Sequence, residues 1–193
     1  MKALVLRTVG ILIDPVPEWA RIEHESGDPA ILLGRYVAVL ALIPALAGFI
    51  GASIIGAALP GGSIVRTSIF DGLFGAIFGY VITFAAVFLL ALAIDALAPA
   101  FGGKRSFRNA LKLAIYSYTP IWLSGIFLLL PGLRFLALTG FYGAYLLWTG
   151  LPLLMKSSEQ KSQTYAAVIV VAACTLTVLS AAIQRAVFGT PSV

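Results

Sequence analysis

The chain has 193 residues, of which 60% are hydrophobic and only 11% are charged, and its mean hydropathy is +1.00. A soluble domain of this length does not need so much apolar surface, so the composition excludes a soluble globular fold. In such a chain the net charge of +5 indicates basic loops beside a membrane, and no nucleic-acid partner is expected. The single cysteine, Cys174, excludes an internal disulfide.

Residues 1–34 are predicted to form a cytoplasmic amphipathic arm. Apolar residues between Leu4 and Leu12 recur at roughly helical spacing, which is typical of a helix that lies in the membrane interface; a mobile polar arm is the alternative. Trp19 is predicted at headgroup level and as the contact for a partner protein. The apolar run at 3–13 is short and interrupted by an arginine, so no cleaved signal peptide is expected.

Residues 35–193 are predicted to form an all-α membrane domain with five transmembrane helices in one bundle. Runs of about 20 apolar residues are long enough to cross the hydrocarbon core of a bilayer. The predicted spans are about 36–59, 69–97, 113–130, 133–155 and 166–188. The turn Pro131–Gly132 joins the third and fourth spans into a hairpin.

Prolines and glycines give four of these spans an expected shape. Proline cannot donate the helical hydrogen bond, so the helices are predicted to kink at three positions: Pro44, Pro120 and Pro152. In the second span, small residues recur at steps of three and four. They place a thin face where another helix can approach closely, and its predicted packing residues are Gly72, Gly75 and Gly79.

Basic residues before the third span are predicted to contact anionic lipid headgroups. They are Lys104, Arg105, Arg108 and Lys112. The alternative is that they only set the topology. With five spans, ten of the 13 lysines and arginines fall on the side of the N-terminus, and only Arg66, Arg134 and Arg185 fall on the other. Because cytoplasmic loops carry the excess of basic residues, the N-terminus is predicted to be cytoplasmic.

The sequence contains no recognisable catalytic arrangement. Its one histidine, His24, lies in the acidic part of the arm, and neither a metal nor a cofactor is expected there. Asp71 and Asp95 fall near span ends, where they can reach water or headgroups; a polar contact inside the bundle is the alternative. No motif of a nucleophile, a zinc site or a phosphate loop is present, so an enzyme is not expected.

Several short pieces follow one another in an ordered pattern. They are Asp14–Pro15 with Glu18–Trp19 and Ile22; Leu42–Pro44 with Phe49–Gly51; Phe101–Gly103 with Tyr116–Ser117 and Thr119–Pro120; and Tyr145–Leu147, Thr149–Pro152 and Met155–Lys156 with Lys161. In these pieces the chain resembles bacterial members of the Yip family, named for eukaryotic proteins that interact with Rab-type GTPases. The resemblance implies five spans, a cytoplasmic N-terminus and a place in the bacterial inner membrane. The acidic-aromatic DLYGP-type motif of the eukaryotic branch is missing.

These observations favour a non-enzymatic membrane protein with an organising or adaptor role. It would act through protein and lipid contacts of its charged arm, its basic loops and its small-residue helix face. The expected partners are the lipid bilayer with its anionic headgroups, and another membrane protein or a second copy of the chain. The alternative function is a small transporter, channel or lipid-moving protein that uses the proline-broken helices.

Overall fold

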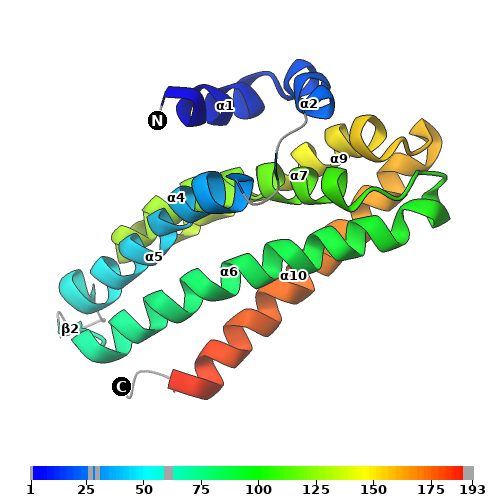
Figure 1. Cartoon of the computed structure of the whole chain (residues 1–193). Coiled ribbons are helices and arrows are strands. Elements are labelled where there is room, and N and C mark those ends of the chain that lie inside the picture. The colour runs from blue at the N-terminus through cyan, green and yellow to red at the C-terminus, as the bar shows by residue number, and fades with distance from the viewer. Residues whose placement is uncertain (1, 26–27, 29–30, 59–62, 189–193) are drawn as a thin grey trace.

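The computed structural model describes residues 2–25, 28, 31–58 and 63–188. Two short helices, α1 (Lys2–Ile13) and α2 (Pro15–His24), lie together across one side of a bundle of long helices (Figure 1). Five segments are long and apolar enough to cross a membrane: Leu32–Ile55, Ile69–Phe101, Phe107–Leu129, Pro131–Met155 and Gln160–Ser180. The prediction of an all-α fold with five spans is therefore confirmed, although the predicted end of the first span, at residue 59, lies outside the described residues.

The first span is an irregular helix. Its pieces are the π-helix η1 (Leu32–Val37), α4 (Ala38–Leu40), α5 (Leu42–Phe49) and the π-helix η2 (Ile50–Ile55). The helix is interrupted at Ala41, three residues before Pro44, because the proline cannot bond to the carbonyl of the preceding turn. The Pro44 ring instead packs on Gly125, where a Cβ atom would lie 2.5 Å from the proline Cβ. The glycine thus makes room for the proline of the neighbouring helix.

A small hairpin connects the first two spans. Strands β1 (Ala57–Ala58) and β2 (Ile64–Val65) pair in antiparallel fashion. The second span follows as α6 (Ile69–Leu97) and ends in the 3-10 helix η3 (Ala98–Phe101). Its first turn is capped because the hydroxyl of Ser68 accepts a hydrogen bond from the backbone N–H of Asp71 at 3.1 Å.

The third and fourth spans both change helix type along their length. The third contains α7 (Phe107–Ser117), α8 (Thr119–Ser124) and the 3-10 helix η4 (Gly125–Leu129). Its α-helix is interrupted at Tyr118, just before Pro120. The fourth begins as the 3-10 helix η5 (Pro131–Phe141) and continues as α9 (Tyr142–Met155), which contains Pro152 without a break. Because a 3-10 helix rises by about 2.0 Å per residue, η5 is longer and narrower than an α-helix of the same sequence.

The fifth span belongs to α10 (Glu159–Phe188), which runs beside α6 (Figure 1). The third span lies at the centre of the bundle, with α7 packed between α6 and α9. Every residue of α7 from Ala110 to Ser117 is buried, whereas α6 and α10 expose many large apolar side chains. This distribution is expected of a membrane bundle, because the outer helices meet lipid and need not be covered by protein.

Candidate functional site

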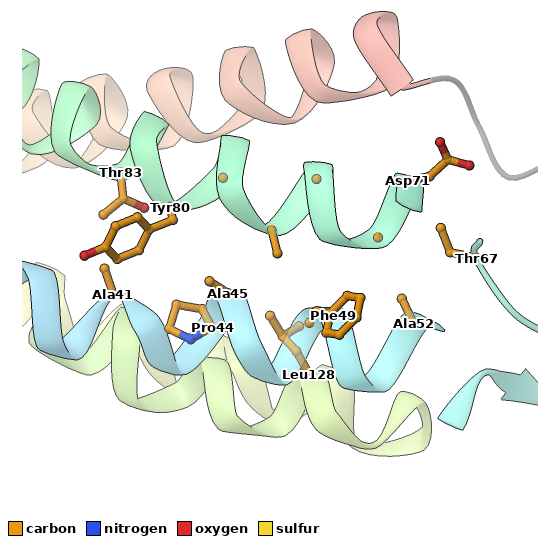
Figure 2. Close-up of a pocket in the computed structure, with 15 residues that line it drawn as sticks. Ala41, Pro44, Ala45, Phe49, Ala52, Thr67, Asp71, Tyr80, Thr83 and Leu128 are labelled. Atoms are coloured by element: carbon orange, nitrogen blue, oxygen red, sulfur yellow. The ribbon is translucent and has the colours of Figure 1, made fainter. Parts of the chain in front are cut away.

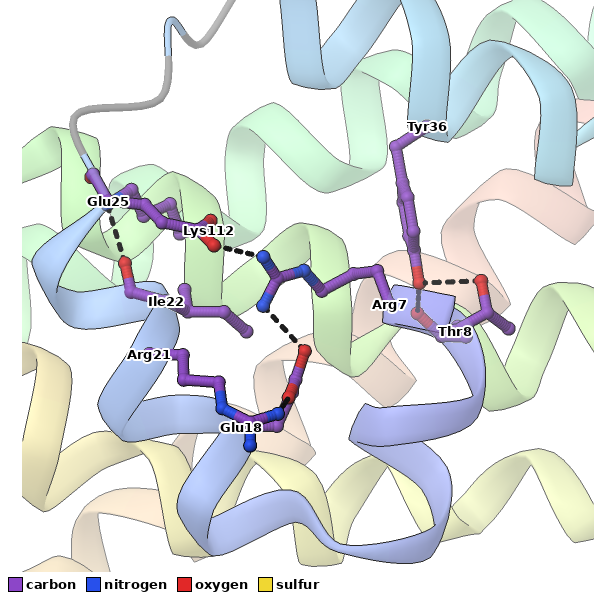
Figure 3. A network of polar contacts seen from close by, with 9 residues as sticks. Arg7, Thr8, Glu18, Arg21, Ile22, Glu25, Tyr36 and Lys112 are labelled. Carbon is purple, nitrogen blue, oxygen red and sulfur yellow. Dashed lines mark hydrogen bonds and ion pairs between the residues drawn. The ribbon is translucent and has the colours of Figure 1, made fainter. Parts of the chain in front are cut away.

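The arm, which we define as helices α1 and α2, is attached to the bundle by a network of polar contacts (Figure 3). The chain reverses at Asp14, and Pro15 opens α2 at a position where its missing N–H is not needed. Arg7 of α1 pairs with Glu18 of α2, with 2.6 Å between Nη1 and Oε1. The same guanidinium pairs with Glu25, and Arg21 also contacts Glu18 at 2.9 Å. These ion pairs fix the two helices of the arm against each other.

The charge of Arg7 is stabilised despite its partial burial. Desolvation acts to lower the pKa of Arg7. The electrostatic interactions with the Tyr116 phenolic oxygen, Glu25 and Glu18 outweigh it, so the pKa of Arg7 is raised. The guanidinium also lies over the Tyr116 ring, with 5.9 Å from its Cζ atom to the ring centroid. Arg7 therefore joins the two helices of the arm to each other and also joins the arm to the third span. Sequence reasoning missed this role of Arg7.

A chain of three hydroxyl groups joins the arm to two spans. Thr8 of α1 donates to the hydroxyl of Tyr36 at 3.3 Å, and the Tyr36 hydroxyl is 2.9 Å from that of Thr119 (Figure 3). All three residues are buried. Inside an apolar environment each of these groups needs a partner, so the two hydrogen bonds specify where α1 lies relative to the first and third spans.

Trp19 occupies a position that differs from the expected one. The structure places its indole inside the chain with no exposed surface, whereas the sequence pattern predicts it at headgroup level and as a contact for a partner protein. Its Nε1–H donates to the Thr149 hydroxyl at 3.2 Å, and its ring packs edge-on to Tyr116. Gly150 leaves the space that the indole fills, since a Cβ there would lie 2.8 Å from the ring. The sequence signal that could have predicted this contact is Gly150 next to the hydroxyl of Thr149.

Lys112 also differs from its predicted role. Its side chain is buried, and its Nζ donates to the carbonyl of Ile22 at 2.8 Å and to that of Glu25. The ammonium group thus bonds to carbonyls at the end of α2, where a helix carries partial negative charge. Lys112 is therefore not available to lipid headgroups. The other three residues of the predicted basic cluster, Lys104, Arg105 and Arg108, are exposed.

The loop after the fourth span completes the attachment of the arm. Lys156, which has a left-handed backbone with φ of 55°, pairs with Glu23 of α2. The hydrogen bond from Lys156 lowers the pKa of Glu23. At the other end of the arm, the Tyr142 hydroxyl donates to the carbonyl of Leu12 at 2.9 Å. The arm is thus bonded to the first, third and fourth spans.

A groove of about 420 Å³ lies between α5 and α6, on the part of the bundle away from the arm (Figure 2). Of the predicted packing residues, Gly72 is in direct contact, since a Cβ there would lie 1.9 Å from the Ser53 hydroxyl. A Cβ at Gly75 would meet nothing within 4 Å. All three glycines, Gly72, Gly75 and Gly79, line the groove. Asp71 also lines this groove, and in Figure 2 its carboxylate points away from α5.

Polar groups that could perform chemistry are few in the described part of the chain. No group of three or more metal-ligating side chains occurs there. Asp71 accepts a hydrogen bond from the Ser68 hydroxyl at 2.8 Å, which gives it a role in the helix cap. Two side-chain atoms are buried without a hydrogen-bond partner among the described residues: Asp95 Oδ1 and Ser117 Oγ.

Five apolar spans and an N-terminal helical hairpin that is bonded onto them define the class of this protein, a multi-pass helical membrane protein. The chain belongs to the Yip1 domain family, whose model matches residues 9–182, and the predicted family is thereby confirmed. A curated relative is the inner membrane protein YohC of Escherichia coli strain K12. It is 29% identical over 160 residues, which cover 81% of this chain and 82% of the relative. The protein of the same name from Escherichia coli O6:H1 matches equally well. No solved structure matches the chain.

Proposed function

We propose that this protein organises the membrane by holding a rigid apolar wedge in one leaflet. The observation that carries this proposal is the orientation of α1. The face that carries Arg7, Thr8 and the fully buried Ile11 is turned toward the bundle, whereas large apolar side chains are exposed on the other side. They are Val5, Leu6, Val9 and Ile13, with exposed fractions between 45% and 77%. A helix that turns its apolar face outward is stable only if that face meets lipid.

The depth of the arm follows from its surroundings. An interfacial helix buries its apolar face by about 5–10 Å at the boundary between headgroups and acyl chains. The exposed Lys104 and Arg105 in the loop before α7, and Arg108 in its first turn, lie at the same end of the bundle, because the N–H of Lys104 bonds to the carbonyl of Met155 beside Lys156. Each of these basic side chains contributes about 1 kcal/mol near an anionic leaflet. Together the wedge and the cations favour an anionic membrane surface as the partner.

The leaflet concerned is proposed to be the cytoplasmic one. The arm and the two loops beside it contain ten of the 13 basic residues of the chain. Loops that are rich in lysine and arginine stay on the cytoplasmic side. A reporter that is active only in the cytoplasm should give a signal when it is fused before residue 1 and none when it is fused after residue 193. The reverse pattern would contradict this orientation.

A reconstitution experiment tests the wedge. The purified protein is inserted into liposomes that contain phosphatidylglycerol, and vesicle diameter is measured by electron microscopy as the protein-to-lipid ratio rises. The wild type is expected to produce smaller or tubular vesicles, and the double variant Leu6→Ser, Ile13→Ser is expected to leave them unchanged. The matched control is Leu89→Ser, an exposed apolar residue of α6. Equal vesicle shapes with the wild type and the double variant would contradict the proposal.

A second candidate function, lipid movement between leaflets, is favoured by the groove between α5 and α6. Its walls are small residues, and its polar lining consists of Thr67, Asp71, Tyr80 and Thr83. Such a groove can take up an acyl chain from the bilayer side. The test is transfer of a fluorescent phospholipid between leaflets of liposomes. Because Gly75 faces open space, Gly75→Leu should fill the groove without a clash and abolish transfer. A transfer rate equal to that of empty liposomes would leave only the organising function.

A further inference from the structure

A second cavity, of about 400 Å³, lies on a different part of the bundle from both the arm and the groove. It is formed by α6, the end of α7, α8, η5, α9 and α10, and its walls are mostly apolar. Its apolar lining includes Leu90, Ile121, Leu147 and Val170. The volume is at the low end of the range for sites that hold a small molecule, which limits the occupant to a single narrow chain.

One end of this cavity carries an unpaired positive charge. Arg134 is the only charged residue in its lining. The side chain is exposed, and it forms neither an ion pair nor a hydrogen bond with any residue that the structure describes. Arg134 follows Pro131, where the fourth span begins, so it lies near the membrane surface. A free guanidinium at that level is suited to an anionic group, which it can bind with two parallel hydrogen bonds.

The other end carries an unsatisfied hydroxyl. Ser117 lines the cavity with 2% of its surface exposed, and its Oγ has no hydrogen-bond partner among the described residues. Gly143 closes the cavity behind it, because a Cβ at Gly143 would lie 2.4 Å from the Ser117 carbonyl oxygen. At membrane depth there is no water to satisfy such a group, and a buried hydroxyl without a partner costs about 1–3 kcal/mol. The hydroxyl is explained if a ligand supplies the missing partner.

The two ends are separated by less than the thickness of a membrane. Arg134 and Gly143 are nine residues apart along the fourth span, which corresponds to roughly 18 Å at the rise of a 3-10 helix. The Arg134 side chain reduces this separation by its own length. An occupant that contacts both ends is therefore an extended apolar chain with an acid group at one end and a polar group along its length.

We propose that this cavity binds a long-chain fatty acid that carries a hydroxyl group on its chain. The carboxylate pairs with Arg134, the chain fills the apolar walls, and the chain hydroxyl exchanges a hydrogen bond with Ser117. Recognition combines charge, a narrow apolar channel and one deep polar contact, which together discriminate against plain and uncharged chains. This proposal does not depend on the arm or on the organising function.

Cys174 provides the measurement, because this exposed thiol lines the same cavity and is the only one in the chain. The purified full-length protein in detergent is treated with a maleimide, and the labelling rate is recorded against the concentration of stearate or 12-hydroxystearate. We expect both acids to slow labelling, with 12-hydroxystearate about fivefold more potent, as one net hydrogen bond of roughly 1 kcal/mol provides. The uncharged octadecanol should protect at least fivefold less than stearate, since about 1 kcal/mol of charge interaction is lost.

Two variants and a control decide the roles of the residues. In Ser117→Ala the two acids should protect Cys174 equally. In Arg134→Gln the protection by both acids should fall toward that given by octadecanol. The control Arg66→Gln removes another basic residue expected on the same side of the membrane and should change neither acid. The proposal is overturned if the hydroxylated and plain acids are equally potent in the wild type, if Arg134→Gln has no effect, or if acetate alone protects. The detergent melting temperature of each variant shows that it remains folded.

Discussion

At the arm side of the bundle, polar side chains from the arm and three spans bond to one another, whereas the far side has few such contacts. The arm side contains the Arg7 ion pairs, the Tyr36 hydroxyl chain and the Trp19 and Lys112 bonds. The far side contains 3-10 and π-helical segments, a groove and a cavity. The bilayer supplies no hydrogen-bond partners, so polar contacts at the arm side specify one arrangement. At the far side, small residues leave the groove and the cavity open instead.

The difference matters because membrane helices gain no hydrophobic free energy from packing against each other. The arm side is held by directional bonds and by buried aromatic rings such as Trp19 and Tyr116. The far side is held by close contacts such as that of Gly72 with Ser53. We therefore expect substitutions at the arm side to have large effects, and substitutions at the far side to depend on whether the residue lines open space.

The largest effect is expected for Trp19→Ala. The change removes a fully buried indole and leaves the Thr149 hydroxyl without its donor, so it should destabilise the protein by about 3–5 kcal/mol. Unfolding in SDS–dodecylmaltoside mixtures, followed by circular dichroism, measures the change. The control is Trp148→Ala, whose side chain is 43% exposed and should cost much less. Equal losses for the two variants would show that the arm is not part of the core.

The next largest effect is expected for Arg7→Met. This change leaves Glu18, whose side chain is only 7% exposed, with the single partner Arg21, and should cost about 2–4 kcal/mol. Arg21→Met is the matched control: its side chain is 73% exposed, so the loss should stay below about 1 kcal/mol. Protection of the α1 amides from hydrogen exchange gives a local measurement. If both variants kept full protection, the ion pairs would not hold the arm.

Two neighbouring glycines of α6 test the far side. In Gly72→Ala the added methyl meets the Ser53 hydroxyl, so the variant should be destabilised by about 1–3 kcal/mol. In Gly75→Ala the methyl enters open space, and the better helix propensity of alanine should leave the protein unchanged or more stable by up to about 1 kcal/mol. The same SDS titration compares them. A larger loss of stability in Gly75→Ala than in Gly72→Ala would contradict the placement of Gly75 in an open groove.

The smallest effect is expected at the rim of the arm, for the pair of Glu23 with Lys156. Because the pKa of Glu23 is lowered in the folded protein, the pair stabilises at pH above the ordinary glutamate pKa. This contribution is lost as the pH falls below about 4.5 and through the folded pKa. Glu23→Gln should therefore reduce the melting temperature slightly at pH 7, and this difference should shrink as the pH falls through the folded pKa of Glu23. A difference that stays constant as the pH falls until the protein unfolds would exclude the ion pair as its cause.

Sequence patterns predicted the spans well because each span is a local property of composition. The second span was expected at 69–97, and α6 covers Ile69–Leu97. The contacts of Trp19 and Lys112 could not be predicted in this way, since they depend on residues more than 80 positions away in the chain. An amphipathic pattern shows that Arg7 and the apolar residues lie on different faces of α1. It does not show which face turns toward the bundle, and here the polar face does.

The bond between Trp19 and Thr149 joins residues 130 positions apart, and this separation sets an order of events during synthesis. At about 5–20 residues per second, the ribosome makes the docking site of α2 on the order of ten seconds after the arm. Until then Trp19 lacks its partner on the fourth span, and the arm can bind the leaflet through Leu6 and Ile13 on its exposed apolar face. The arm can dock its Trp19 onto Thr149 and Gly150 only after the fourth span has been inserted. A closed arm therefore marks a chain whose first four spans have been inserted and assembled.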